Sequence, residues 1–578
     1  MKSTIGPVIG IDLGTTNCAL AFTNSEQEDQ VEQFAIPQLV HPGETREESL
    51  LPSFVFLDPS GPIVGVLAQK LGLENAGRLV SSAKSWLSHA GVDRESPILP
   101  PNAPEGVEKI SPVDASRRYL SHLRDAWNSK HADSFDDYHL LVTVPASFDE
   151  VARELTLKAA HEAGYRDVIL LEEPQAAFYA WIERHPNWRE VVGVGDLVLV
   201  IDIGGGTTDF TLIAVKEQAG EIVLERIAVG DHILLGGDNI DAALAHTVAQ
   251  TLPKKLDSIQ FHGLWQQCRA AKEQLLASGS KASEHAITIL GRGTGVVGGT
   301  IKTKLKREDV EHILLDGFLP AVALDEVPEG RHASLSEFGL PYAADAAITR
   351  HLAHFLHRHA AKPTHVLFNG GVLRAGLVGD RILEVLNQWL PQPVVKLASD
   401  DLMHAVARGA AYYGLARQGK GVRVRGGVPR SYYIGIETSM PAVPGMKPPV
   451  KALTVVPFGM EEGGGYQIKD RQFSLRIGER ARFRLFQSTD RKQDGPGDMI
   501  EEIGPGMTGG DIEELTPVEV SLPGNPGETV PVTLESLVTE TGMLELWFVA
   551  QDARRWKLEF NVRPTAGSSR RPPPATGR

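Results

Sequence analysis

Two short segments of the same design constrain this chain most. Residues 11–17 read IDLGTTN and residues 201–209 read IDIGGGTTD, and each lies between two apolar runs. An apolar run, a polar turn and a second apolar run predict a β-hairpin with a polar tip. Glycine lets a backbone approach a ligand closely, and successive turn amides together with threonine hydroxyls can surround an anion. The sequence therefore predicts two phosphate-binding hairpins.

Both hairpins differ from the common nucleotide fingerprints. Neither contains the Gly-Lys-Ser/Thr of a P-loop, and neither opens directly into a helix as a dinucleotide-binding turn does. One Gly-Thr turn alone could be an ordinary hairpin. Two copies with the same order, in which Asp202 follows Asp12 by 190 residues, favour a duplicated site. Repeated Asp-x-Gly hairpins are typical of two-lobe ATP-binding folds such as those of actin, sugar kinases and heat-shock chaperones.

An aspartate precedes each glycine turn. Because carboxylates repel phosphates, Asp12 and Asp202 are predicted to hold Mg²⁺ against the phosphates, mostly through water. A third glycine pair, Gly370 and Gly371, follows a strand-like run over 364–368 and precedes a predicted helix over 378–389. This turn is a candidate to pack against adenosine, although strand–Gly-Gly–helix turns are common.

The composition narrows the class of protein. The formal net charge of −15 disfavours non-specific binding to nucleic acid or to anionic membranes. Two cysteines cannot build a disulfide framework, which fits a reducing compartment. We expect no signal peptide and no membrane span, because the N-terminus lacks an apolar core and no apolar run reaches about 18 residues. A cytoplasmic protein is the expectation.

The predicted secondary structure changes once along the chain. Residues 1–418 alternate strand-like and helix-like patterns, which predicts an α/β domain with helices over 111–129, 149–163, 173–183, 237–251, 265–278 and 405–417. Residues 419–429 are rich in Gly and Arg and are predicted to be a linker. Short strand-like runs with Gly/Pro turns predict a β domain over 430–564. The Pro- and Arg-rich residues 565–578 are predicted to be disordered.

At this point the sequence resembles the DnaK-type, 70-kDa heat-shock chaperone family, as a divergent member. The resemblance covers residues 8–418 and rests on six motifs in the family's order. Besides the two phosphate loops, these are VTVPASF over 142–148, LEEPQAA over 171–177, LGGDN over 235–239 and GGVLR over 370–374. The resemblance implies an actin-like two-lobe ATPase domain that uses ATP/ADP and Mg²⁺ and is followed by a β sandwich.

The resemblance also implies roles for single residues. The implied catalytic residues are Lys84, Glu173, Asp202, Thr207 and Asp12, the last also a metal-holding residue together with Asp202. The implied nucleotide-binding residues are Gly14, Thr15, Thr16, Asn17, Gly204, Gly205, Gly206, Asp209, Gly236, Gly237, Lys272, Glu273, Gly370, Gly371 and Arg374. Pro145 and Arg153 match the family's proline switch and relay arginine, which couple the nucleotide state to the second domain.

The chain also departs from the family pattern. Along the helix that cradles adenine, the family has Glu-x-x-Lys-Arg, whereas this chain has Arg269, Lys272 and Glu273, with the outer charges exchanged. Ile169 stands where the family has an arginine that contacts J-domain proteins, and the family's leucine-rich linker is replaced by GVRVRGG over 421–427. No helical pattern follows Val562, so the family's α-helical lid is expected to be absent.

These observations favour an ATP-dependent chaperone-like protein. Its expected partners are protein or peptide clients and a nucleotide exchange factor, with a J-domain co-chaperone less well supported because of Ile169. Three alternatives stay open at this stage. They are a small-molecule kinase on the same two-lobe fold, an actin-like filament protein, and a nucleotide sensor with little turnover.

Overall fold

The structure is a computed structural model. It describes residues 6–561 except 24–29, 90, 102, 219–220, 290–300, 331–339, 341, 400, 419–423, 426–427, 429, 438–449, 461–463, 489–490, 492, 504–511, 516, 540–542 and 553. Three expectations lie outside these residues. They are the disordered tail over 565–578, the absence of a helical lid after Val562, and most of the linker over 419–429. The chain divides into two compact units, residues 1–424 and 425–578.

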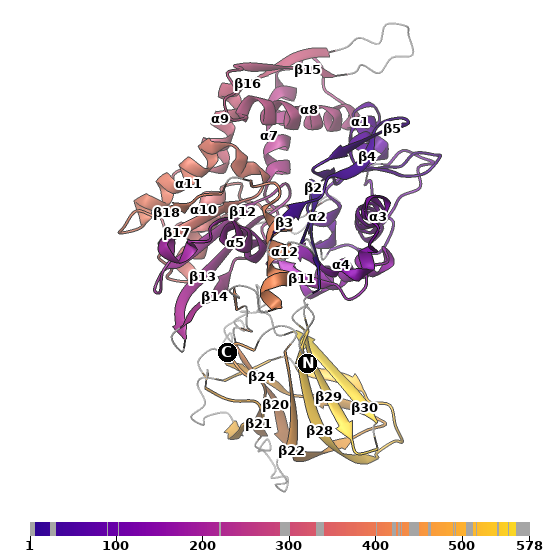
Figure 1. Ribbon diagram of the computed structural model, residues 1–578, viewed down its shortest axis with the longest axis vertical. Helices are drawn as coiled ribbons and strands as arrows, with labels where there is room; N and C mark the ends of the chain where they lie inside the picture. The colour runs from indigo at the N-terminus through magenta and orange to yellow at the C-terminus, as the bar shows by residue number, and fades with distance from the viewer. Residues whose placement is uncertain are drawn as a thin grey trace, which may run out of the picture. The chain divides into compact units, whose positions relative to one another are not determined.

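The first unit contains two sheets with one repeated strand pattern (Figure 1). Five strands of the first sheet run in the order β11-β10-β1-β2-β3, and five of the second run β18-β17-β12-β13-β14. In each set of five, the first three strands pair with one another in parallel, and the last three pair antiparallel. The bounds of the first set are β1 Val8–Leu13, β2 Asn17–Thr23, β3 Val31–Gln33, β10 His139–Val144 and β11 Ile169–Glu172. Those of the second are β12 Leu197–Ile203, β13 Thr208–Gln218, β14 Glu221–Val229, β17 His365–Asn369 and β18 Val395–Leu397.

The two predicted phosphate hairpins are present as predicted. β1 pairs antiparallel with β2, and β12 pairs antiparallel with β13. Strand β12 reads LVLVIDI and is buried along almost its whole length, as expected for a strand covered on both faces. The polar tip of each hairpin therefore stands at the end of a buried central strand.

Helices cover both sheets. Their bounds are α1 Val66–Glu74, α2 Ala83–Leu87, α3 Pro112–Lys130, α4 Glu150–Glu162, α5 Glu173–Arg184, α7 Gly237–Gln250, α8 Ser258–Leu276, α9 Arg307–His312, α10 Ile348–Arg358, α11 Gly376–Trp389 and α12 Ala405–Arg417. Each sheet has its own large apolar core. Helix α12 packs against α5 and β1, and smaller clusters of apolar residues from α5 and α12 join the sheets. No helix among the described residues is long and apolar enough to cross a bilayer.

Most predicted helices agree with the structure to within two residues, but α8 begins seven residues earlier than predicted. Asp257 explains the earlier start, because its carboxylate accepts from the Gln260 amide at 2.8 Å while the Gln260 side chain accepts from the Asp257 amide at 3.2 Å. This reciprocal capping is a helix-start signal that the sequence contains. Helix α10 was not predicted, although Ile348, Leu352 and Phe355 recur at helical spacing and are buried.

The second unit contains strands only in its described part. One sheet runs β25-β21-β20-β24-β26, with bounds Met499–Ile503, Val450–Val456, Ser431–Glu437, Leu485–Ser488 and Glu513–Glu514. The other runs β22-β28-β29-β30, with bounds Gly465–Arg476, Thr529–Val538, Met543–Ala550 and Arg555–Asn561. A short pair, β23 Arg480–Phe483 and β27 Val518–Ser521, completes it. Residues of both sheets build one apolar core, which includes Tyr432, Leu453, Leu534 and Leu546.

The close packing of α12 yields a testable prediction. A Cβ atom on Gly409 would lie 1.7 Å from the Ala176 carbonyl oxygen of α5. We expect Gly409→Ala to lower the free energy of unfolding of the first unit by about 1–3 kcal/mol, because the helices must move apart. The measurement is denaturant unfolding followed by circular dichroism.

Gly263 of α8 provides the matched control, because a Cβ atom there meets nothing within 4 Å. We expect Gly263→Ala to raise stability by up to about 1 kcal/mol through helix propensity. A Gly409→Ala variant as stable as wild type would contradict the packing described for α5 and α12.

Candidate functional site

The tips of the two hairpins face each other. A Cβ atom on Gly205 would lie 2.0 Å from the Thr16 hydroxyl oxygen of the first loop. A Cβ atom on Gly206 would lie 2.3 Å from the Ser85 hydroxyl oxygen and 3.0 Å from the Thr15 methyl carbon. Only glycine permits this approach. Amides and hydroxyls from two distant parts of the chain therefore converge on one small volume.

Two further glycine turns enclose the second loop. The Gly237 amide donates to the Gly204 carbonyl at 3.0 Å, and the Asp238 amide donates to the Gly205 carbonyl at 2.7 Å. Gly370 has φ of +94°, and a Cβ atom there would lie 2.3 Å from the Ile203 carbonyl oxygen and 2.6 Å from Asp202 Oδ1. The three predicted glycine turns of this half thus form one continuous wall.

Four carboxylates gather beside the loops. The Lys84 ammonium donates to Glu173 Oε1. Asn369 Nδ2 donates to Asp202 Oδ2 at 2.7 Å, and the Thr143 hydroxyl lies 3.5 Å from Asp12 Oδ1. Asp209 accepts from the hydroxyls of Ser147 and Thr207.

The electrostatics of this cluster favour a bound cation. Burial, and next the charge of Glu173, raises the pKa of Asp12 from 3.8 to about 7 and the pKa of Asp202 well above its ordinary value. Burial also raises the pKa values of Glu173 and Asp209. Burial disfavours the ammonium of Lys84, but the charges of Glu173 and Asp12 outweigh this effect and raise its pKa. A single lysine faces four carboxylates, so a positive charge is missing.

A magnesium ion fits this deficit. Asp12 and Asp202 offer hard oxygen donors at the ends of β1 and β12, as Mg²⁺ prefers. Among the described residues no three carboxylate, histidine or cysteine side chains are arranged to hold a metal directly. The residues present therefore fit an ion that keeps most of its waters and takes further oxygens from phosphates.

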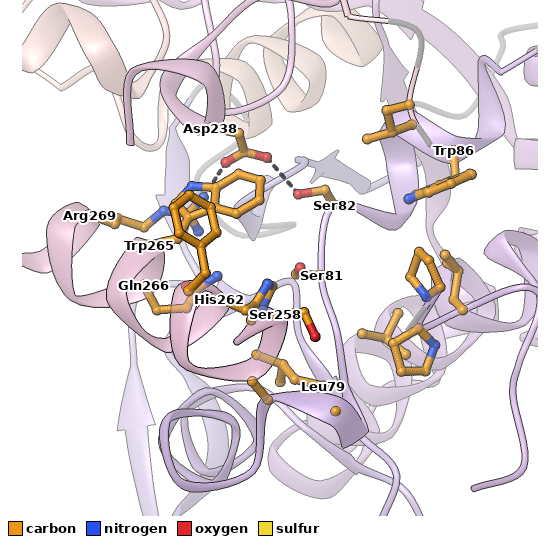
Figure 2. Close-up of a pocket in the computed structure, with 18 of the residues that line it drawn as sticks. Leu79, Ser81, Ser82, Trp86, Asp238, Ser258, His262, Trp265, Gln266 and Arg269 are labelled. Atoms are coloured by element: carbon orange, nitrogen blue, oxygen red, sulfur yellow. Dashed lines mark hydrogen bonds and ion pairs between the residues drawn. The ribbon is translucent and has the colours of Figure 1, made fainter. Parts of the chain in front are cut away.

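The exchanged charges of α8 form a separate network. Arg269 pairs with Asp238 and, at 2.9 Å, with Asp241, while Lys272 pairs with Asp241 at 2.7 Å. Glu273 is exposed on the same helix. Arg269 is therefore neutralised by α7 instead of by Glu273. Ser82, which precedes α2, donates to Asp238 Oδ2 at 2.6 Å, so Ser82 and Arg269 reach Asp238 from opposite sides (Figure 2).

A cavity of about 300 Å³ lies beside this network. The segment with Leu79, Ser81 and Ser82 lines it on one side, and one face of α8 from Ser258 to Arg269 lines it on the other (Figure 2). Residues 99–101 also belong to its lining. Asp238 and Arg269 belong to its wall, whereas the predicted nucleotide-contacting glycines do not line it. Because the Asp238 amide also donates to the Gly205 carbonyl, Asp238 connects the wall of the cavity to the second glycine loop.

The remaining predicted residues lie at the margin of the cluster. Arg374 and Gly371 are exposed in the short turn after β17. Pro145 follows β10 and is buried. Arg153 of α4 is buried, and its guanidinium donates to Glu172 Oε1 at 3.0 Å, to the Ala146 carbonyl at 3.1 Å and to the Phe148 carbonyl at 3.3 Å. Arg153 therefore fixes the segment after Pro145 to the end of β11.

Several site residues were missed from the sequence. Ser147, His232 and Asn369 contact the carboxylate cluster directly or through one hydroxyl. Ser147 could have been found, because it lies in the VTVPASF motif over 142–148. His232 lies in a loop after β14 without any motif, and only the folded chain brings it to Ser147.

Comparisons with known proteins agree with this geometry. Residues 8–320 match the family model described as Hsp70 protein. A chaperone protein HscA homolog of Acidovorax sp. (strain JS42) is 30% identical over 332 residues, which cover 53% of this chain and 47% of that protein. One of Azotobacter vinelandii is 33% identical over 291 residues, 47% of this chain and 43% of that protein. In each case the chain spans about half the length of the curated relative or less.

The raised pKa of Asp12 predicts how stability depends on pH. Its folded-state pKa of about 7 lies above the ordinary value of 3.8, so the stabilisation present below about pH 4 is lost as the pH rises to 7. Asp12→Asn removes this loss. At pH 8, without nucleotide, we expect this variant to exceed wild type by about 1–3 kcal/mol in unfolding free energy, measured by chemical denaturation at pH 5 and 8.

Asp125→Asn, on the exposed face of α3, is the control and should leave the pH dependence unchanged. Mg²⁺ with ATP should stabilise wild type more than Asp12→Asn. A variant that is less stable than wild type at pH 8 would refute the charge deficit.

Proposed function

The chain belongs to the Hsp70 family, and we propose that it binds ATP with Mg²⁺ between the two phosphate hairpins and hydrolyses it to ADP and phosphate. The facing loops carry this proposal, because Gly205 and Thr16 approach too closely for any side chain at Gly205. The missing positive charge beside them supports a metal–nucleotide complex. The curated relatives are named chaperones, which supports an ATP-dependent chaperone function for this chain.

The chain's own residues would act mainly by position. Backbone amides of the loops and the hydroxyls of Thr15 and Thr16 would donate to phosphate oxygens, and the Thr207 hydroxyl, which donates to Asp209 in this structure, would turn towards them. Asp12 and Asp202 would hold Mg²⁺, which neutralises the phosphates when bound. Lys84, fixed by Glu173, would steady the γ-phosphate and the attacking water. Electrostatic stabilisation of this kind is the main means by which proteins accelerate phosphoryl transfer.

The second unit is proposed to bind clients as a β sandwich. Two sheets that share one apolar core support the sandwich. Strand β22 is an edge strand in the described part of its sheet, with β28 on its paired side, and Tyr466 on it is 43% exposed. An extended client segment could add to such an edge through backbone hydrogen bonds.

The coupling of the two activities is proposed to use Pro145 and Arg153. Ser147 links their segment to Asp209, and Arg153 links it to β11. A change at the phosphate loops can therefore reach α4 through a short rigid path. Exchange factors and J-domain proteins are proposed partners, the latter with altered contacts at Ile169.

The first test of this function measures ATP binding and turnover. We expect wild type to bind Mg²⁺–ATP and Lys84→Ala to lose hydrolysis by about 100-fold or more, with ATP affinity changed by less than about tenfold. Titration calorimetry and single-turnover hydrolysis provide the two readouts. Lys158→Ala, an exposed lysine, is the control.

A wild-type protein that binds no Mg²⁺–ATP would overturn the proposal. Tight binding without turnover would favour the nucleotide sensor. Phosphate transfer to a sugar would favour the kinase, and nucleotide-dependent sedimentation would favour the filament protein.

The second test measures client release. We expect ATP to accelerate dissociation of a fluorescent extended peptide from wild type by about tenfold or more. Gly205→Val should abolish this response, because its side chain would collide with Thr16. Gly263→Ala should respond as wild type does. Slow peptide release in both nucleotide states would contradict ATP control of client binding.

A further inference from the structure

A series of hydrogen-bonded side chains runs from the carboxylate cluster away from the glycine loops. The Ser147 hydroxyl donates to Asp209 Oδ1, and its oxygen lies 2.7 Å from His232 Nδ1. On the other side of the ring, His232 Nε2 lies 2.9 Å from the Ser88 hydroxyl oxygen. Asp209 and His232 come from the half built on the second sheet, whereas Ser147 and Ser88 come from the first. Each of the three links therefore crosses between the halves.

Counting hydrogens shows that this series of side chains holds one hydrogen fewer than its hydrogen-bonding positions can take. Ser88 donates its hydroxyl hydrogen to the Ser85 carbonyl at 2.9 Å, so towards His232 Nε2 it can only accept. A neutral imidazole then carries its single hydrogen on Nε2 and presents a bare lone pair at Nδ1. Ser147 has one hydrogen, which it donates to Asp209. The row Asp209 Oδ1, Ser147 Oγ and His232 Nδ1 therefore holds one hydrogen where two fit.

The surroundings of His232 keep its ring neutral in the resting state. Burial lowers the pKa of His232 to about 4. The charged groups that face it are the carboxylates of Asp149 and Glu173, which favour the imidazolium, and the cations Arg94 and Lys84, which oppose it. The Phe148 ring meets it edge-on at 5.8 Å between centroids. Ser147 and His232 form no hydrogen bond or ion pair with either aspartate assigned to Mg²⁺ among the described contacts, whereas Asp209 is paired with Asp202 across the β12–β13 hairpin.

Resting on the proposed ATP hydrolysis, we propose that Ser147 and His232 are positioning residues that take up the proton released when water attacks ATP. The water oxygen bonds to the γ-phosphorus, and the bond from that phosphorus to the β–γ bridging oxygen breaks, so that ADP leaves with the electron pair. The proton of the water passes to Asp209. Ser147 turns its hydroxyl to His232 Nδ1, gives it that hydrogen and takes the proton from Asp209.

The products are then ADP, phosphate and a protonated His232, so atoms and charge balance. The imidazolium donates from Nδ1 to Ser147 and from Nε2 to Ser88, and Ser147 again donates to Asp209. Every hydrogen-bonding position in the row is filled. Asp209 is left ionised, so it can act in the next turnover once His232 has lost its proton to solvent.

The test uses the full chain and compares His232→Ala and Ser147→Ala with wild type. We expect both variants to bind Mg²⁺–ATP within about threefold of wild type and to hydrolyse prebound ATP about 10- to 100-fold more slowly. Ser147→Thr keeps the hydroxyl and should retain most of the rate. The matched control is His122→Ala, which removes another largely buried histidine, whose Nε2 donates to the Pro37 carbonyl at 2.9 Å.

Added imidazole separates proton uptake from a merely structural role. It should restore hydrolysis in His232→Ala, where the ring site is empty, but not in Ser147→Ala, where the relay is cut. A His232→Ala protein that hydrolyses ATP at the wild-type rate, or that is slowed and does not respond to imidazole, would overturn the proposal. If His232→Ala does not fold, a wild-type rate in Ser147→Ala has the same force.

The failure of this inference differs from the failure of the proposed function. Wild type that binds ATP without hydrolysing it would remove both the ATPase assignment and the relay. Wild type that hydrolyses ATP while Ser147→Ala and His232→Ala keep its rate would remove the relay alone.

Discussion

The unequal charge around Lys84 is the constraint on which the rest of the site depends. Asp12, Glu173, Asp202 and Asp209 are held together by four different strands and helices, and one ammonium cannot neutralise them. Isolated buried carboxylates are strongly disfavoured unless they are protonated or paired with a cation. The fold therefore holds these carboxylates together at a cost in free energy, which the proposed metal–nucleotide complex would relieve. The carboxylate cluster lowers the stability of the ligand-free fold, and a bound cation is expected to raise it again.

The repeated sheet pattern explains how such a cluster can be assembled. Each half places a hairpin at the end of a buried central strand, so two equivalent tips meet when the halves pack together. The meeting is possible only because Gly205 and Gly206 lack side chains opposite Thr16 and Ser85. Packing of α12 on β1 and α5, again through glycine, fixes the distance between the halves. The close approach of α12 to α5 and β1 and the close approach of the two hairpin tips therefore depend on the same packing of the two halves.

Local signals carried most of what the sequence could predict. The hairpins, the strand β12 and the helices α3 and α12 follow from apolar patterns and turn residues, and the structure confirms them. The start of α8 depends on the side chain of Asp257, whose signal was present but weaker than the apolar pattern that begins at Trp265. His232 could not be found in this way, because its partners Ser147 and Ser88 lie 85 and 144 residues away in the chain. Such contacts depend on how the two halves meet, which no local pattern encodes.

The exchanged charges of α8 show how a departure from a family pattern can be absorbed. A reversed Arg269–Glu273 pair on one helix would have been the simplest outcome, but Glu273 is exposed and Arg269 turns to Asp238 and Asp241. With Lys272, two cations and two carboxylates then neutralise one another in a buried setting, where an unpaired charge would be strongly destabilising. Because Ser82 also binds Asp238, the network ties α8 to the segment before α2 in the opposite half. The charges of α8 thus help to hold the two halves together.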